Sequence, residues 1–387
     1  MHICLYTETA LPKLGGQQIA IDHLARHLTS LGHSITLLTQ PPRSPLIAND
    51  ADLPYTVIRH PRYLSTTHLL SWYKRHLLRL HQQKPIDILH CHSLYPTGYL
   101  ASLAKPQLHR PPFSGAAVGP RVPLILTSHG GDVRPVGGLL ARKPRLLPRY
   151  VRAVQSADAL VAISRFTRDG YLRFDPACSP RIHDIPNGVD LAQFAQPAPR
   201  PADLDPAIQP HNYLLFIGRL TRQKGVDILL QATPLLKSHE NLRILIVGVG
   251  PDEENLRFLA GSGEVFKTYF LGAQTGLRKT WLLQNALCTI LPSRDFEAFG
   301  LVALESYASA RPIIASNLPG LADLVHPHQT GLLVPPESPP ALAAAIQLFL
   351  DNPTSATTMG QAGLAFAQSY DWRQIALQHV KLYESLL

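Results

Sequence analysis

The stretch Glu297-Ala-Phe-Gly-Leu-Val-Ala-Leu-Glu305 predicts both a fold class and a ligand site. It follows the apolar run Ala286–Pro292, which is short enough to be a buried strand, and the residues after Gly300 have helical periodicity. Glu297 therefore falls in a strand-to-helix loop and Glu305 on the helix. In an open α/β sheet, ligands bind where such loops leave the carboxyl ends of the strands.

The same loop offers groups suited to a ligand with phosphates and hydroxyls. The backbone N–H groups of Gly300 and Leu301 open the helix, where the helix dipole favours anions. The carboxylates of Glu297 and Glu305 accept hydrogen bonds from hydroxyl groups. A sugar nucleotide carries both kinds of group, so the pattern favours such a ligand.

The composition is that of a globular protein of a reducing compartment. The chain has 387 residues, 45% hydrophobic and 16% charged, which is enough for two domains with buried cores. Its four cysteines are scattered without a C-x-x-C pair, which is typical of buried free thiols. It lacks an apolar run of the roughly 18 residues that a membrane span needs, and a basic leader before an apolar stretch. We therefore expect a cytoplasmic protein, either free or peripheral at the inner face of a membrane.

The positive charge is concentrated in the first half of the chain. Residues 1–190 hold 22 Lys+Arg and 11 Asp+Glu, whereas the remainder holds 14 and 16. Residues 53–86 contain no acidic residue and six basic ones, beside several leucines, and residues 134–152 repeat this composition. Two interpretations stay open: docking on an anionic membrane, to which each basic residue contributes about 1 kcal/mol, or amphipathic helices whose charges face water. Nucleic acid is not expected as a partner, because no nucleic-acid-binding module accompanies the charge.

Strand-like and helix-like segments alternate along the chain, which predicts parallel sheets with helices on both faces. Five prolines in residues 195–212 predict an extended connector between two such domains, 1–194 and 213–370. Residues 371–387 predict an amphipathic helix that returns to the first domain, and the Pro-rich residues 105–123 predict an inserted loop. The expected strands are His2–Tyr6, Ser34–Leu38, Ile88–Cys91, Leu124–Ser128, Ala159–Ile163, Arg181–Ile185, Tyr213–Ile217, Arg243–Val247, Tyr269–Leu271, Leu287–Leu291 and Pro312–Ala315. The expected helices are Gln17–Leu31, Tyr150–Ser156, Val226–Lys237, Glu253–Leu259, Arg278–Gln284 and Leu301–Ser309.

Two loops of the first half contain candidate binding residues. Gly15-Gly16 lies between the first strand and a helix, where glycines let backbone N–H groups approach a phosphate, or simply form a turn. Thr127-Ser128-His129-Gly130-Gly131-Asp132 follows a predicted strand, so His129 and Asp132 either face a ligand or tie the loop together.

In the second half, Gly218-Arg219-Leu220 precedes Lys224-Gly225 in another strand-to-helix loop. The two cations can converge on a diphosphate, although a solvated basic turn has the same sequence. We reject Gly248-Val-Gly250 as a dinucleotide site, because Pro251 and an acidic run follow it and a third glycine is missing. Asp50-Ala-Asp52 and Asp203-Leu-Asp205 are interpreted as turns, and no His/Cys/Asp spacing is typical of a metal site.

Taken in order, these motifs resemble the retaining family 4 glycosyltransferases of the GT-B fold (glycosyltransferase group 1). The resemblance covers residues 1–370 and implies two Rossmann-like α/β domains whose parallel sheets face an interdomain cleft. The matching residues are Gly15-Gly16, His129 with Asp132, Asn187-Gly188-Val189-Asp190, Gly218-Arg219-Leu220 with Lys224-Gly225, Glu297 to Glu305, and Gly331-Leu-Leu-Val334.

The resemblance assigns roles to individual residues. It implies that Glu305 holds the ribose of a nucleoside-diphosphate sugar and that Arg219 and Lys224 bind its diphosphate. His129 and Glu297 would contact the transferred sugar. The further donor-binding positions would be Gly15, Gly16, Asp132, Asn187, Gly218, Phe299, Gly300 and Leu301.

The implied reaction transfers a hexose-type sugar to a hydroxyl of a glycan, lipid-linked or small-molecule acceptor with retention at the anomeric carbon. Neither a metal nor any other cofactor is implied, because Arg219 and Lys224 would neutralise the leaving diphosphate. Ala310 departs from the family pattern, which usually has glycine there. Three alternatives stay open: a nucleotide-sugar epimerase or hydrolase on the same scaffold, a nucleotide-sugar binding protein that has lost catalysis, and, more remotely, a redox enzyme, for which a complete dinucleotide fingerprint is missing.

Overall fold

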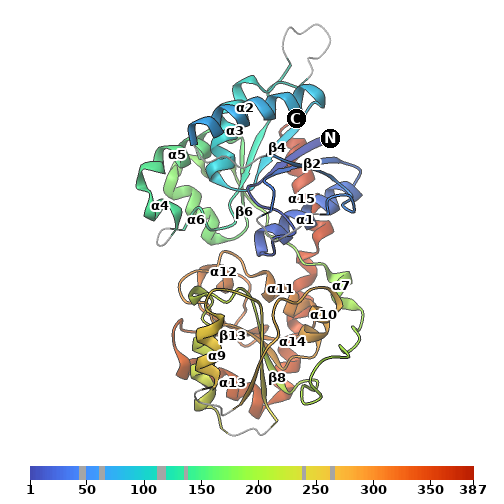
Figure 1. Ribbon diagram of the computed structural model, residues 1–387, viewed down its shortest axis with the longest axis vertical. Helices are drawn as coiled ribbons and strands as arrows, with labels where there is room; N and C mark the ends of the chain where they lie inside the picture. The colour runs from blue at the N-terminus through green and yellow to red at the C-terminus, as the bar shows by residue number, and fades with distance from the viewer. Residues whose placement is uncertain (43–48, 61–65, 111–118, 135–137, 238–240, 262–265) are drawn as a thin grey trace. The chain divides into compact units, whose positions relative to one another are not determined.

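The computed structural model describes residues 1–42, 49–60, 66–110, 119–134, 138–237, 241–261 and 266–387, with only the backbone for 66–71. The chain divides into two compact units, Met1–Asn187 with Trp372–Leu387, and Gly188–Asp371. The last helix therefore belongs to the first unit, where it is drawn in red near the blue helix α1 (Figure 1).

The first unit is built on a parallel sheet with the order β3-β2-β1-β4-β5-β6-β7 in its described part. β1 pairs with β2, where Ile3 lies opposite Ile35, and on its other side with β4, where Ile3 lies opposite Ile88. The strand order thus reverses between β1 and β4. The strands are β1 His2–Tyr6, β2 Ser34–Thr39, β3 Thr56–Arg59, β4 Ile88–Cys91, β5 Leu124–Thr127, β6 Ala159–Ala162 and β7 Ile182–Asp184.

Helices connect these strands, and the C-terminal helix α15 packs beside α1. Trp372, the first residue of α15, stacks on the ring of His23 in α1, with centroids 5.6 Å apart and planes 4° from parallel. The helices are α1 Gly16–Ser30, α2 Thr66–Gln83, α3 Tyr99–Ala104, α4 Leu139–Arg142, α5 Leu147–Ser156, α6 Arg165–Phe174 and α15 Trp372–Ser385.

The second unit repeats this plan with the described strand order β10-β9-β8-β11-β12-β13. All of its strand pairs are parallel, and the order reverses between β8 and β11. The strands are β8 Tyr213–Ile217, β9 Arg243–Val247, β10 Lys267–Phe270, β11 Cys288–Leu291, β12 Ile313–Ser316 and β13 Gly331–Val334. The helices are α7 Leu191–Ala195, α8 Val226–Ala232, α9 Glu253–Gly261, α10 Gly276–Gln284, α11 Leu301–Ala308, α12 Pro319–Ala322, α13 Pro339–Asp351 and α14 Pro353–Ala367.

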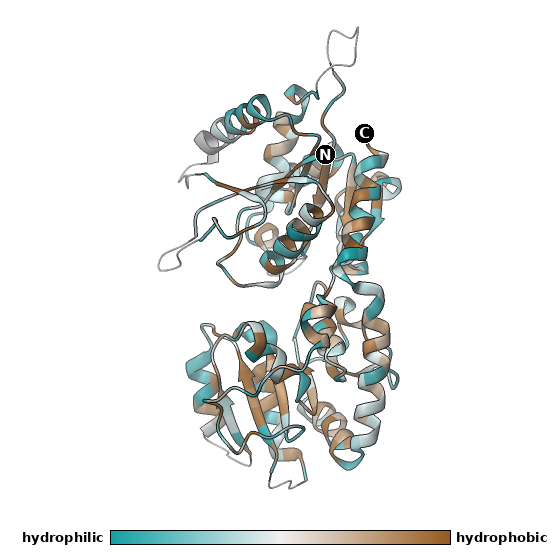
Figure 2. Ribbon diagram, turned by 90° about the vertical axis from the view of Figure 1, so that its right-hand side faces the viewer, coloured by the Kyte–Doolittle hydropathy of each residue, from teal (hydrophilic) through white to brown (hydrophobic). Residues whose placement is uncertain are grey.

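The inner strands are buried on both faces, because helices cover both sides of each sheet. Every residue of β1, β4, β11 and β12 is buried, as expected for parallel strands that appear in sequence as continuous apolar runs. Figure 2 shows these apolar strands in brown, with hydrophilic teal confined largely to helices and loops.

The two-domain α/β fold with parallel sheets is confirmed, and each expected strand overlaps an observed one. The strands that the sequence analysis did not identify, β3 and β13, lie at the edges of the two sheets. β3 is partly exposed, so its sequence lacks the continuous apolar run of a central strand. β13 is mostly buried, and its residues Gly331–Val334 are identified in the sequence only as a family motif.

The boundary between the units differs from the expected one. It lies after Asn187, and residues 195–212 belong to the second unit instead of forming a connector. Leu204 and Ile208 are buried there, and Arg200 donates hydrogen bonds to the carbonyl groups of Asp205 and Ile208. The prolines therefore restrict the backbone of this segment, while the apolar side chains between them are buried against the rest of the second unit.

Two further expectations fall partly outside the described residues. Of residues 105–123, 111–118 are not described, and the segments on either side of them are joined by an isolated antiparallel bridge between His109 and Arg121. Of the basic segment 53–86, helix α2 buries Tyr73, Leu77 and Leu80 and exposes other residues of the same turns. This segment thus contains an amphipathic helix whose apolar face packs on the core.

The cysteines are buried and free, as expected. None of the described helices combines the length and apolarity required to cross a membrane. Ala310 has φ of 54°, in the left-handed region where glycine is favoured, which gives a physical reason for the glycine that the family usually places there.

Candidate functional site

Each sheet has one point at which the strand order reverses, and most predicted site residues follow the strands at that point. β8 leads into Gly218, Arg219 and Lys224, and β11 leads into the Glu297 loop. In the first unit, β1 leads into Gly15-Gly16. Carboxyl ends of strands at such reversals are the usual ligand sites of open α/β sheets.

In the second unit, glycines let neighbouring loops approach more closely than side chains would allow. A Cβ at Gly225 would lie 2.0 Å from the carbonyl oxygen of Pro292, and one at Gly320 would lie 2.1 Å from that of Glu297. Gly225 also has φ of 66°, which glycine adopts without strain. The turn before α8, the loop after β11 and the start of α12 are therefore held against one another by direct backbone contact.

The predicted residues Lys224 and Glu297 form an ion pair. Lys224 Nζ lies 2.5 Å from Glu297 Oε2, and the Ser293 hydroxyl donates to the same oxygen over 3.1 Å. Gln223 joins the two loops as well, because its side-chain amide donates to the carbonyl oxygen of Phe296 over 3.0 Å. The ion pair is only about one-fifth exposed, which weakens solvent screening.

Arg219, in the same loop as Lys224, is exposed. In the described part of the chain, no acidic side chain pairs with its guanidinium. Its charge is thus available to an anion from solution, whereas the charge of Lys224 is shared with Glu297.

Glu305 has one bound and one unbound carboxylate oxygen. Oε1 accepts from Lys279 Nζ over 2.6 Å, whereas Oε2 is buried without a hydrogen-bond partner among the described residues. A buried acceptor left unpaired costs free energy, so this oxygen is suited to accept from a ligand hydroxyl. Lys279 was not predicted from the sequence, where its only signal was a basic residue early in a helix.

The remaining predicted residues of this loop act through the backbone. Gly300 precedes α11 with φ of 105°, and Leu301 is the first residue of the helix, so their N–H groups lie at its N-terminal end. The Phe299 side chain is buried, 6.4 Å from the Tyr370 ring between centroids. Phe299 therefore anchors the loop in the core instead of presenting its ring to a ligand.

In the first unit, Gly15 and Gly16 begin α1. Gly15 has an extended backbone with φ of 172°, which any residue can adopt, and an added Cβ would meet the end of the Gln18 side chain. Glycine at position 15 is thus not required by backbone strain. Gln17 ties this turn to β4, because its amide donates to the carbonyl oxygen of His92 over 3.0 Å.

His129 and Asp132 occupy the loop after β5, as expected, but they have different surroundings. Asp132 accepts from the Leu94 N–H over 2.5 Å and from the Ser128 hydroxyl, so its carboxylate ties the loop together. His129 is half-buried, and its Nε2 lies 3.2 Å from Nδ1 of His92. Burial lowers the pKa of His129 to about 4, which keeps its ring neutral at pH 7.

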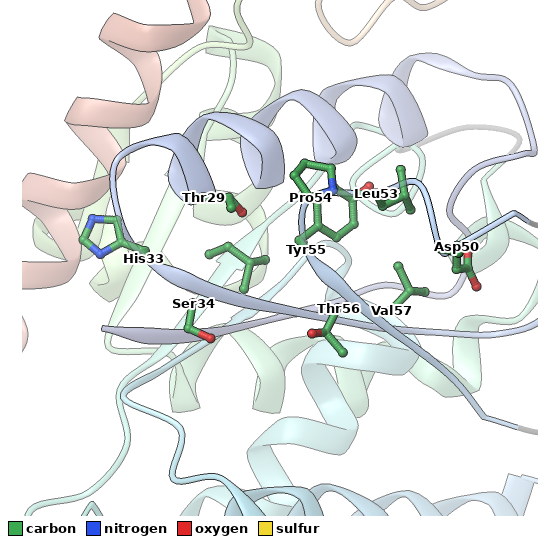
Figure 3. A pocket seen from close by; sticks show the side chains of 11 residues that line it. Thr29, His33, Ser34, Asp50, Leu53, Pro54, Tyr55, Thr56 and Val57 are labelled. Atoms are coloured by element: carbon green, nitrogen blue, oxygen red, sulfur yellow. The ribbon is translucent and has the colours of Figure 1, made fainter.

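The described residues of the first unit line cavities of different size. Asn187 and His129 line a small one of about 10 Å³. A larger cavity of about 540 Å³ lies at the start of β2 and β3 and contains none of the predicted site residues (Figure 3). Its visible lining includes Thr29, His33, Tyr55 and Thr56.

The acidic tripeptides are engaged in ion pairs, in agreement with their interpretation as turns. Asp50 pairs with Arg59, Asp203 with Arg278 and Asp205 with Lys267. The described residues hold no group of three or more His, Cys, Asp or Glu side chains placed to bind a metal ion.

Models of two glycosyltransferase families match most of the chain. The model of glycosyl transferases group 1 matches residues 205–365, and that of Glycosyltransferase Family 4 matches residues 14–193. The chain belongs to the group 1 glycosyltransferases. Its two α/β domains with parallel sheets are the GT-B fold.

Individual relatives agree with this assignment. The chain is 32% identical over 270 residues to a glycogen synthase of Mycobacterium tuberculosis, which covers 68% of this chain and 63% of that protein. Sucrose-phosphate synthase from Thermosynechococcus elongatus aligns with a TM-score of 0.73 and 26% identity, over 100% of this chain and 98% of that one. Alr3699/HepE of Anabaena, in complex with UDP and glucose, aligns over 100% of both chains with a TM-score of 0.79 and 16% identity.

The sequence analysis also missed Glu8, which follows β1 in the first unit of this glycosyltransferase. Burial, and secondarily the charge of Asp132, raise the pKa of Glu8 to about 7, whereas Lys13 lowers it. Folding therefore favours the protonated carboxyl group.

A Glu8→Gln variant tests this environment. Because the folded-state pKa lies above the ordinary value, the folded state binds more protons than the unfolded state between about pH 4.5 and 7. The free energy of unfolding of the wild type should therefore fall through this window as pH rises. Glu8→Gln should lack that fall. In urea unfolding, its free energy of unfolding should therefore rise relative to that of the wild type by up to about 3 kcal/mol between pH 5 and pH 8.

The exposed Asp169 on α6 offers a control in the same unit. Asp169→Asn should follow the wild type at both pH values. Equal pH dependence of Glu8→Gln and the wild type would show that Glu8 ionises normally in the folded protein.

Proposed function

We propose that the chain is a retaining glycosyltransferase that moves a hexose-type sugar from a nucleoside-diphosphate sugar to an acceptor hydroxyl. The acceptor would be a glycan, a lipid-linked saccharide or a small molecule. The observation that carries the proposal is the buried Oε2 of Glu305, which has no partner among the described residues and lies on α11, the helix that follows the loop of the Lys224–Glu297 ion pair. Family membership supports the reaction class.

The second unit would bind the donor. A ribose hydroxyl would donate to Glu305 Oε2, which relieves the cost of the unpaired oxygen. Arg219, exposed and without an acidic partner in the described residues, would bind the diphosphate together with Lys224. Alr3699/HepE, a structural neighbour, was solved with UDP and with UDP-glucose, which supports a nucleoside-diphosphate donor.

The Lys224–Glu297 pair would connect donor binding with the reacting sugar. Glu297 is hydrogen-bonded by Lys224 and Ser293, so its carboxylate is held in place and suits binding of sugar hydroxyls more than nucleophilic attack. Lys224 would stabilise the charge that develops on the departing phosphate.

Retention would then follow from front-face attack, in which the departing phosphate oxygen takes the acceptor proton. Arg219 and Lys224 would supply the charge that a metal ion gives in other transferases, so we propose a metal-independent reaction without a cofactor. His129 would contact the transferred sugar from the first unit.

The first unit would bind the acceptor, and its basic face would meet an anionic membrane if the acceptor is lipid-linked. Around α4 and α5, Arg142, Lys143 and Arg145 are exposed, and Leu147 is 45% exposed beside them. Cations next to exposed apolar groups suit reversible binding at an anionic surface. We accordingly propose a cytoplasmic enzyme that acts at the inner face of a membrane.

A thermal-shift panel with UDP, GDP, ADP and their sugar conjugates tests the donor site. A ligand at about one hundred times its dissociation constant should stabilise the folded protein by about 2.7 kcal/mol. Glu305→Gln should lose much of the shift, because its amide cannot reproduce both the pairing with Lys279 and the free acceptor oxygen.

The exposed Glu254 of α9 provides the matched control, and Glu254→Gln should keep the full shift. Stabilisation by NAD alone, or an unchanged shift in Glu305→Gln, would contradict the proposed site.

A Glu297→Gln variant separates turnover from donor binding. We expect its rate of nucleoside-diphosphate release from the stabilising donor to fall on the order of 100-fold, because a charged group that contacts the reacting sugar is lost. Donor-induced stabilisation should persist, since Arg219 and Glu305 are unchanged. Turnover of Glu297→Gln at the wild-type rate would show that Glu297 is not a catalytic residue.

A further inference from the structure

A cluster of histidines lies beneath the loop that carries His129. The rings of His90 and His92 are 4.3 Å apart between centroids, those of His92 and His129 are 5.4 Å apart, and those of His90 and His379 are 5.8 Å apart. Except for His129, these residues are at most 5% exposed. Histidine side chains at such burial need defined hydrogen-bond partners.

Hydrogen bonds hold His90 and His92 in fixed positions. His90 Nδ1 lies 2.8 Å from the Tyr383 hydroxyl of α15, and its Nε2 lies 2.7 Å from Thr127 Oγ1. The backbone of His92 donates to the Tyr6 carbonyl oxygen over 2.8 Å and accepts from Gln17 over 3.0 Å. The His92 ring therefore packs on the fixed ring of His90, and two hydrogen bonds hold the His92 backbone.

His92 meets His129 through a single nitrogen pair. His92 Nδ1 lies 3.2 Å from His129 Nε2, and His92 Nε2 is buried without a partner among the described residues. His129 Nδ1 has no hydrogen bond within the described part either, and its ring is half-buried. Burial lowers the pKa of both histidines, so both rings are neutral at pH 7 and the pair shares one proton.

The position of that proton follows from the cost of unpaired groups. If His129 donated, the proton of His92 would sit on its buried Nε2 as an N–H without an acceptor, which is rare in folded proteins. If His92 Nδ1–H donates to His129 Nε2, the unpaired atom is an acceptor, and unpaired buried acceptors are less rare than unpaired buried N–H groups.

We propose that His92 is a positioning residue that donates from Nδ1 to His129 Nε2, so that His129 carries its own proton on Nδ1 and donates it to an oxygen of the bound substrate. This inference rests on the proposed glycosyl transfer, in which His129 contacts the transferred sugar. His129 is then a hydrogen-bond donor and not a base toward its ligand. His90 and Tyr383 support the ring of His92 from behind, which links the C-terminal helix to the candidate site.

Substitutions at position 92 distinguish a hydrogen-bond donor at the place of Nδ1 from a side chain that only packs there. The side-chain amide of Asn can reproduce Nδ1 of histidine, whereas that of Gln reproduces Nε2. With the donor identified by thermal shift, His92→Asn should keep kcat within about threefold of the wild type, while His92→Gln and His92→Leu should lose on the order of 10- to 100-fold in kcat with little change in KM. Circular dichroism checks that each variant is folded.

The ¹⁵N NMR spectrum of the full chain with labelled histidine shows directly which ring nitrogen of His129 carries the proton. His129, assigned by the resonances missing in His129→Gln, should show a protonated Nδ1 and an unprotonated Nε2 at pH 7. In His92→Leu this preference should be lost. A protonated Nε2 of His129 in the wild type, or full kcat in His92→Gln, would overturn the proposal.

The NMR measurement does not depend on turnover. If the wild type transfers no sugar while His129 shows the expected tautomer, the proposed function fails and the His92 contact stands. If transfer occurs but Nε2 carries the proton, the function stands and the role of His92 is wrong.

Discussion

The candidate donor site depends on backbone contacts that only glycine permits at the point where β8 and β11 lie side by side. Parallel pairing brings the ends of these strands to one edge of the sheet, but a side chain at Gly225 would push their loops apart. A side chain at Gly320 would push the start of α12 away from the Glu297 loop. The Cβ positions at 2.0 and 2.1 Å from carbonyl oxygens show how little space remains. Lys224 and Glu297, separated by 73 residues in sequence, form an ion pair because of this constraint.

The chemistry of the site follows from which charges are already paired. Lys224 and Lys279 each hold one carboxylate in place, whereas Arg219 and one oxygen of Glu305 are left for a ligand. A nucleoside diphosphate presents complementary groups, anionic phosphates and ribose hydroxyls. The first unit differs in that its candidate residues are hydrogen-bonded to one another or to their own loop: Asp132 is hydrogen-bonded within its loop, and the neutral His129 is hydrogen-bonded to His92. Such groups suit recognition of uncharged hydroxyls.

The sequence predicted what depends on local pattern. Buried parallel strands such as β1 and β11 appear as apolar runs, and Gly300 before Leu301 marked the start of α11. It did not predict contacts that only tertiary packing creates. Lys279 pairs with Glu305 only because α10 and α11 pack side by side. The sequence around His92 is that of any histidine beside a strand, and its contact with His129 exists only because β5 brings His129 next to it. The prolines of 195–212 suggested a connector, because burial of Leu204 and Ile208 has no local signal strong enough to outweigh them.

We propose that this group 1 glycosyltransferase transfers its sugar with retention. The most direct measurement is time-resolved ¹H NMR of the anomeric proton in the first product formed from an α-configured nucleotide sugar. In the absence of a known acceptor, the slow transfer to water serves the same purpose, provided that the spectrum is taken before mutarotation. Retention predicts that the α-anomer appears first. Initial appearance of the β-anomer would contradict it.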